Sequence, residues 1–109
     1  MRQWDILMFP FGKEKRHPAV IISNDETCRN VDIEEVNALL CTSAKVNRSP
    51  KLTEMMLDES DGMDWKTMVR CDRIYLLPKS QFQEPKGNVT RERRSRIARK
   101  LVEVLRLPI

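Results

Sequence analysis

Short apolar segments, each stopped by turn-forming residues, constrain the fold of this chain more than any other feature. Their valines, isoleucines and aromatic residues favour extended backbone. Pro10 and Gly12, the pair Asn24-Asp25, and Gly62 are typical of turns between such segments. This pattern predicts the short strands of a mainly antiparallel sheet. The predicted strands cover residues 3–9, 18–23, 36–43, 52–58 and 65–77.

The last fifth of the chain has the periodicity of a helix instead. Thr90 is a suitable N-cap, Ile97, Leu101 and Leu105 form one apolar stripe, and Pro108 ends the segment. Residues 24–35 are predicted as a loop or a short strand, and residues 79–88 as a loop or a single helical turn.

This order of elements predicts an α+β, mainly β fold. A small, partly closed antiparallel barrel with a C-terminal helix accommodates several short strands followed by one helix. The chain has 109 residues, which suits one domain with a single core. We therefore expect one domain over residues 1–109.

Charge is distributed unevenly. Residues 86–106 hold eight basic and two acidic side chains, a local charge of +6, whereas the whole chain carries +4, so the remainder carries −2. A basic segment on a nearly neutral body suits a polyanion or an acidic partner protein. A solvated helix face is the alternative interpretation.

Several function classes are disfavoured by composition. No run of residues approaches the roughly 18 apolar positions that a membrane-spanning helix needs. The N-terminus MRQWDILMF is a poor signal peptide, so we expect a cytoplasmic protein without a membrane partner. Three widely spaced cysteines do not indicate a disulfide framework, and with one histidine they supply few metal ligands. We expect no metal and no cofactor.

Arg70 and Asp72, in the segment MVRCDRIYL, are the strongest candidates for chemistry. In a strand, residues two apart point to the same face, so the guanidinium and the carboxylate are expected to be neighbours. They form either a structural ion pair or a catalytic pair. In the catalytic case the carboxylate deprotonates a ribose 2′-OH while the guanidinium holds the phosphate.

Three further side chains are candidates. His17, the single histidine, is expected in a charged loop between the first two strands, where it is either exposed or functional. Thr42 and Ser43 end a predicted strand, and their hydroxyls either bind phosphate or ribose or cap the following loop.

Four stretches, in this order, resemble the PemK/MazF family of toxin ribonucleases from bacterial toxin–antitoxin systems. WDILMFPF resembles the family's opening GDIxxxxF, and HPAVIISND resembles RPAVVIS. CTS at 41–43 is similar to the family's ITS or VTS, and MVRCDRI at 68–74 is similar to the VRCDQI strand of the PemK-like branch. Each motif alone is weak, but the four together cover almost the whole chain.

The resemblance implies an SH3-like barrel, a homodimer, and metal-independent cleavage of single-stranded RNA such as mRNA. It also implies a cognate antitoxin whose acidic tail blocks the RNA groove. By the same resemblance, Arg70 and Asp72 are active-site residues and Thr42 and Ser43 contact RNA. His17 corresponds either to the family's active-site histidine or to the arginine that usually precedes the loop-ending proline.

The expected reaction is attack by the ribose 2′-OH, which leaves a 2′,3′-cyclic phosphate. Asp72 acts as the general base and Arg70 stabilises the charge on the phosphate. The proton donor is either Arg70 or His17, and imidazole exchanges protons more readily than guanidinium near neutral pH. The residues expected to position the RNA are Arg16, Thr42, Ser43 and Lys45. Trp65 and Phe11 either stack a base or pack in the core.

Two alternatives remain open at this point. One is a catalytically impaired family member that binds RNA or a protein target. The other is a nucleic-acid-binding module led by the basic C-terminal helix, whose affinity would fall steeply with salt.

Overall fold

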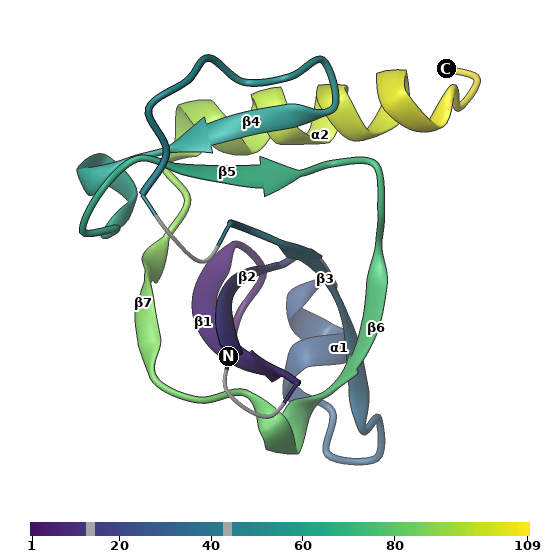
Figure 1. Ribbon diagram of the computed structural model, residues 1–109. Helices are drawn as coiled ribbons and strands as arrows, with labels where there is room; N and C mark the ends of the chain where they lie inside the picture. The colour runs from purple at the N-terminus through teal and green to yellow at the C-terminus, as the bar shows by residue number, and fades with distance from the viewer. Residues whose placement is uncertain (13–14, 43–44) are drawn as a thin grey trace.

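A curved five-stranded antiparallel sheet forms the body of the computed structural model, which describes residues 1–12, 15–42 and 45–109. Its strand order is β6-β3-β2-β1-β7, and all of these neighbours pair antiparallel (Figure 1). The strands are β1 (Asp5–Phe11), β2 (Lys15–Ile21), β3 (Glu35–Leu40), β6 (Tyr75–Pro78) and β7 (Pro85–Asn88).

A two-stranded ribbon and the C-terminal helix cover one side of this sheet. The ribbon consists of β4 (Glu54–Leu57) and β5 (Thr67–Arg70), and the helix is α2 (Arg91–Leu105). An isolated bridge between Cys41 and Val69 joins the end of β3 to β5. The ribbon and α2 lie together above the sheet (Figure 1). The result is a barrel that is only partly closed.

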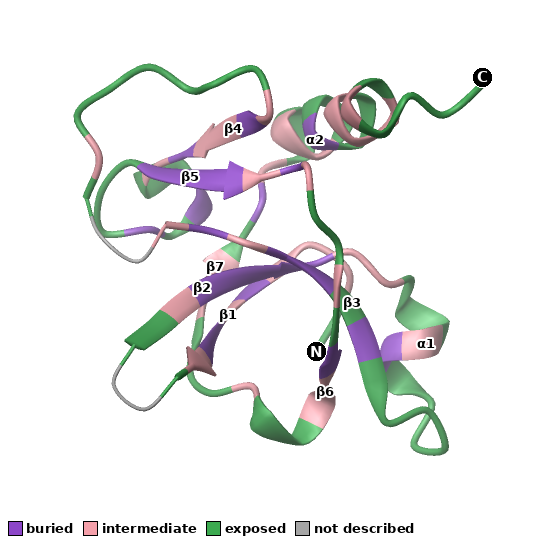
Figure 2. Cartoon of the chain, turned by 45° about the vertical axis from the view of Figure 1, so that its right-hand side comes forward, coloured by how far each residue is buried: buried purple, intermediate pink, exposed green. Residues whose placement is uncertain are grey.

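Two apolar clusters follow from the alternation of side chains along the strands. Val20 joins the cluster shared by the sheet, the ribbon and α2, which also contains Val69 and Ile97. Its neighbours Ala19 and Ile21 belong to the second cluster, which packs against the short helix α1 (Asp25–Arg29) through Cys28. Figure 2 shows buried segments in all of these elements.

The predicted fold class is confirmed: the chain is α+β, mainly β, with an open antiparallel sheet and one C-terminal helix. The helix begins where predicted, because the Thr90 hydroxyl accepts a hydrogen bond from the backbone N–H of Arg93. None of the helices in the described part of the chain is both long enough and apolar enough to cross a membrane.

The prediction of a charged loop before Pro18 is wrong. Strand β2 begins at Lys15, and the β1–β2 ladder pairs Phe11 with Lys15 and Phe9 with His17. Charged side chains at the end of a hairpin can point to solvent while their backbone stays in the ladder. Because the polar residues before Pro18 were interpreted as a loop, the predicted start of this strand, residue 18, is three residues later than the observed start, Lys15.

The prediction of one long strand over 65–77 is also wrong. Strand β5 ends at Arg70, β6 begins at Tyr75, and residues 71–74 cross from the ribbon to the large sheet. The sequence pattern did not predict two further elements. Helix α1 occupies part of the region expected to be a loop or strand, where the Asn24 side chain caps it, and β7 forms within 79–88 after a 3-10 turn.

Candidate active site

Arg70 and Asp72 lie together, as their spacing predicts, although Asp72 follows β5 instead of lying on it. The Arg70 Nη2 donates to Asp72 Oδ2 at 3.2 Å. Their side chains are 44% and 30% exposed, so both can be reached from solvent. The other carboxylate oxygen, Asp72 Oδ1, is buried and has no hydrogen-bond partner among the described residues. Asp72 Oδ2 is thus oriented by a cation, whereas Oδ1, being buried, reaches a substrate proton only if the carboxylate turns toward solvent.

Arg73 adds a second positive charge near Asp72, but the carboxylate that faces Arg70 is paired elsewhere. Glu54 lies opposite Arg70 in the β4–β5 ladder, but its carboxylate accepts two hydrogen bonds from Arg48, at 2.6 and 2.9 Å. The hydrogen bonds from Arg48 lower the pKa of Glu54 to about 2. The negative charge of Glu54 is therefore already balanced by Arg48, and Glu54 does not compete with Asp72 for the guanidinium of Arg70.

Cys71, between the two candidates in sequence, is not a nucleophile. It is fully buried, and burial raises the pKa of its thiol to about 12. A buried thiol that stays protonated at neutral pH does not attack a substrate. The backbone N–H of Cys71 donates instead to the Thr53 carbonyl at 2.8 Å, which closes the ribbon just before the chain turns toward Asp72.

His17 is oriented by the end of β3. Its Nδ1 lies 3.1 Å from the carbonyl oxygen of Cys41, so Nδ1–H donates to that carbonyl and Nε2 is the nitrogen left to exchange a proton. The Phe11 ring also packs nearly perpendicular to the imidazole, with ring centroids 5.7 Å apart. His17 is half-buried in a strand, which gives it one orientation that a loop position would not.

The end of β3 connects His17 with the Arg70–Asp72 pair. Cys41 accepts from His17 and bridges to Val69, the residue before Arg70. Thr42 then donates its backbone N–H to the Met68 carbonyl at 2.9 Å. Within the described residues no hydrogen bond joins His17 directly to Arg70 or Asp72. The candidates therefore border the same strand end without forming one network.

Two aromatic rings continue in a row from His17. Phe11 contacts His17 on one side and Tyr75 on the other, with the latter centroids 5.8 Å apart. Arg73 interacts with Tyr75, and this hydrogen bond raises the pKa of the Arg73 guanidinium. Sequence reasoning missed Tyr75 and Arg73, although both lie within three residues of Asp72. Aromatic rings interleaved with cations are typical of surfaces that bind single-stranded nucleic acid.

The residues predicted to position the RNA differ in their contacts and in their exposure to solvent. The Thr42 hydroxyl accepts from the backbone N–H of Met68 at 3.1 Å, so it fixes the strand end and keeps its own proton to donate. Lys45 is exposed, and Ser43 lies outside the described residues. Arg16 reaches across β1, where it binds Glu84 at 3.0 Å, and so points away from β3.

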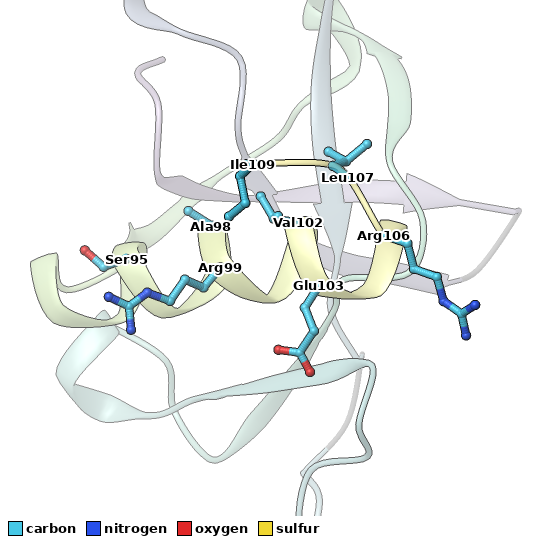
Figure 3. Close-up of a pocket in the computed structure, with 8 residues that line it drawn as sticks. All are labelled: Ser95, Ala98, Arg99, Val102, Glu103, Arg106, Leu107 and Ile109. Atoms are coloured by element: carbon cyan, nitrogen blue, oxygen red, sulfur yellow. The ribbon is translucent and has the colours of Figure 1, made fainter.

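A groove of about 720 Å³ lies elsewhere on the molecule, on the outer face of α2 (Figure 3). The tail after the helix folds back, so that Leu107 and Ile109 line this groove together with Ala98 and Val102. None of the predicted site residues lines it. The groove is therefore separate from the candidate active site.

Comparison with known proteins places the chain in a family. Residues 2–105 match the family model for the PemK-like, MazF-like toxin of type II toxin–antitoxin systems. A comparison with curated proteins found no match.

Solved structures share the fold over essentially the whole chain. An endoribonuclease in complex with its cognate antitoxin, from a mycobacterial species, superposes with a TM-score of 0.82 at 24% identity, covering 100% of this chain and 98% of its own. An endoribonuclease from a mycobacterial species gives 0.81 at 23% identity, covering 100% and 94%. The Mycobacterium tuberculosis toxin MazF-mt6 gives 0.80 at 16% identity, covering 96% and 99%.

The family match spans nearly every element described above and confirms the resemblance seen in the four sequence motifs. This chain therefore belongs to the PemK-like, MazF-like toxin family of type II toxin–antitoxin systems.

Proposed function

We propose that this toxin is a metal-independent endoribonuclease that cuts single-stranded RNA, including mRNA, in the cytoplasm and thereby inhibits translation and growth. The observation that carries the proposal is the contact between Arg70 and Asp72, whose side chains are both partly exposed to solvent. The similarity to two endoribonucleases of the same fold supports it.

The proposed chemistry is an internal transfer at phosphorus. Asp72 accepts the proton of the ribose 2′-OH, and the 2′-oxygen attacks the adjacent phosphorus. Arg70 holds the phosphate and stabilises the negative charge that develops on its oxygens. The bond to the 5′-oxygen breaks, and this oxygen takes up a proton. The products are a 2′,3′-cyclic phosphate and a free 5′-hydroxyl.

We assign His17 as the donor of the proton that the 5′-oxygen takes up. A guanidinium remains protonated throughout the neutral range and is a poor donor, whereas imidazolium gives up a proton readily. Because Nδ1 of His17 is engaged with Cys41, Nε2 is the donating atom. If His17 is the donor, His17→Gln slows cleavage. Cleavage at the wild-type rate in this variant would assign the proton to Arg70.

The direct test is RNA cleavage in EDTA. Wild type is compared with Asp72→Asn and Arg70→Ala on single-stranded RNA, with Asp32→Asn and Arg29→Ala as matched controls on exposed, distant positions. The proposal predicts loss of about 10²-fold or more in the first two variants, the usual size for removal of a general base or an oxyanion-stabilising donor. Equal activity in all five proteins, or a metal requirement, would refute it.

A second candidate function is favoured because, within the described residues, no hydrogen bond joins His17 to the Arg70–Asp72 pair. In this case the chain binds RNA or a protein target without cutting RNA. It predicts growth arrest without RNA fragments, and arrest that survives Asp72→Asn. Northern analysis of cells expressing each variant distinguishes the two functions.

We also propose that Thr42, Ser43 and Lys45 position the RNA, together with Arg16, whose exposed pair with Glu84 is weak enough to open for a phosphate. In this proposal residues 1–109 act as one toxin domain. The cognate partner in this proposal is an antitoxin with an acidic tail, whose negative charge is complementary to basic side chains such as Lys45 and Arg16. The antitoxin complex of a similar endoribonuclease supports this partner class.

The homodimer remains part of the proposal, and the groove on α2 is a suitable contact surface for it. Two α2 helices packed antiparallel through this groove, with their midpoints opposite each other, would place Arg99 of each beside Glu103 of the other. Arg99→Glu or Glu103→Arg alone should then weaken the dimer in sedimentation experiments, and the double variant should restore it. No restoration would reject this surface.

A further inference from the structure

We propose that a small recess beside Thr42, on the far side of β2 from His17, holds one nucleobase of the RNA substrate. This inference rests on the proposed function and extends it to substrate recognition. The recess, named here the Trp65 pocket, has a volume of about 110 Å³. That is nearly four times the roughly 30 Å³ occupied by one water in the liquid, so a planar ring has room to enter.

The base and wall of the Trp65 pocket are apolar. Met8, Pro18 and Met63, all buried, contribute to its lining. The Trp65 indole also lines the pocket, yet 44% of this residue remains exposed. A large aromatic ring left open beside an apolar recess provides a stacking surface, and a nucleobase is the part of RNA that fits such a surface.

Two hydroxyls in the lining supply polar partners for the edge of a base. The Thr42 hydroxyl accepts from the backbone N–H of Met68 and retains its proton for donation. The Thr67 hydroxyl donates to the Trp65 carbonyl at 3.2 Å and retains lone pairs for acceptance, but Thr67 is buried in the free chain and an entering base must uncover it. One donor and one acceptor in a stacking pocket match the mixed edges of nucleobases.

A cation stands in the same lining. Lys86 is 30% exposed at its side chain and lies 3.6 Å from Asp64, whose own side chain is 70% exposed. A solvent-exposed pair of this kind is weak, so the ammonium can exchange Asp64 for a phosphate of the RNA backbone. The pocket thus offers a ring surface, two hydrogen-bonding groups and a positive charge.

The pocket is linked to the proposed catalytic pair by β5. Thr67 lines the pocket at the start of this strand, and Arg70 ends it. Three residues of extended chain span ~10 Å at about 3.3 Å per residue, a short step along an RNA strand. In Figure 1, β5 runs from the loop that contains Trp65 toward the crossing that contains Asp72. A base bound here would place a nearby phosphodiester toward Arg70.

The experiment measures binding of short single-stranded RNAs to Asp72→Asn protein in EDTA, so that no cleavage occurs. A cleavable RNA is made abasic at one position at a time, and each affinity is compared with the intact RNA. The same series is repeated with Trp65→Ala and Trp65→Phe in the Asp72→Asn background. Leu52→Ala, which removes another exposed apolar side chain, is the matched control.

We expect one abasic position to weaken binding about tenfold, the lower end of base–aromatic stacking. In Trp65→Ala the intact RNA should already bind about tenfold more weakly, and the same abasic position should then cost less than twofold. Trp65→Phe should keep most of the effect, and Leu52→Ala should change nothing. Indole fluorescence, measured with Trp65 intact, should be quenched by every RNA except the one abasic at that position.

The inference is overturned if Trp65→Ala binds intact RNA as tightly as its parent, or if the abasic series is the same with and without the indole. If Trp65→Ala does not fold, uniform quenching across the abasic series overturns it. These results leave the proposed function standing as long as wild type cuts RNA. Absence of both RNA binding and RNA cleavage would instead reject the proposed function together with the pocket.

Discussion

Arg93→Met should destabilise the fold more than most surface changes, because Arg93 neutralises a buried carboxylate. Arg93 donates to Asp58 at 2.7 and 2.9 Å and also contacts Asp61. Asp61 is fully buried at its side chain, whereas those of Arg93 and Asp58 are about one-fifth exposed. Asp61 also accepts from the backbone N–H of Thr90 at 2.9 Å. This cluster therefore fixes the start of α2 on the turn that precedes β5.

The magnitude follows from the charge left behind. Removing one partner of a buried ion pair typically costs about 3–5 kcal/mol, because the remaining charge is uncompensated. Since Asp58 is partly exposed and only Asp61 is fully buried, we expect the lower end, about 3 kcal/mol. For a domain of this size each kcal/mol lowers Tm by roughly 4–8 °C. The expected loss is thus at least about 12 °C.

The assay is urea and thermal unfolding of wild type, Arg93→Met and the double variant Arg93→Met/Asp61→Asn. The double variant should recover part of the loss, because the unpaired charge is then gone. Arg96→Met, whose exposed pair with Glu92 lies on the same helix, is the control and should stay within about 0.5 kcal/mol of wild type. A loss below about 1 kcal/mol for Arg93→Met, or no recovery in the double variant, would refute the reasoning.

Three more predictions follow from the buried groups. Gly87→Ala should cost about 1–3 kcal/mol in thermal unfolding, because an added Cβ would lie 2.2 Å from the Asp61 carbonyl oxygen, and an unchanged Tm would contradict this close approach. The pKa of Glu54 falls from 4.5 to about 2 in the folded state, so its stabilisation is complete above pH 4.5 and is lost as the pH falls toward 2; Glu54→Gln should flatten that part of the stability curve, and an unchanged slope would count against the Arg48 pair. Cys71 should resist alkylation in the native protein at pH 8 and react only after unfolding, so rapid labelling of the folded chain would show that its burial is misjudged.

Much of the fold was predictable because apolar alternation and capping are local signals. The strand near Val20 and the helix capped by Thr90 follow directly from residue type. The start of β2 at Lys15 and the short strand β7 do not, since both depend on pairing with β1, which lies elsewhere in the sequence. Helix α1 had a usable signal in Asn24 followed by two acidic residues, but five residues carry little periodicity.

The candidate site was predictable to the extent that its members are neighbours in sequence. Arg70 and Asp72 are two residues apart and do meet, although through a strand end and not through a shared strand face. The contact of His17 with Cys41 depends on the register between β2 and β3, which sequence does not reveal. For the same reason the loop position expected for His17 was wrong.

The chemistry of the RNA ends tests the central claim most directly. Wild type is incubated with a defined single-stranded RNA in EDTA, and the fragments are analysed by mass spectrometry beside those from Asp72→Asn. The proposed mechanism predicts 2′,3′-cyclic phosphate and 5′-hydroxyl ends from wild type and intact RNA from Asp72→Asn. Fragments with 5′-phosphate ends, or equal cleavage by Asp72→Asn, would contradict it.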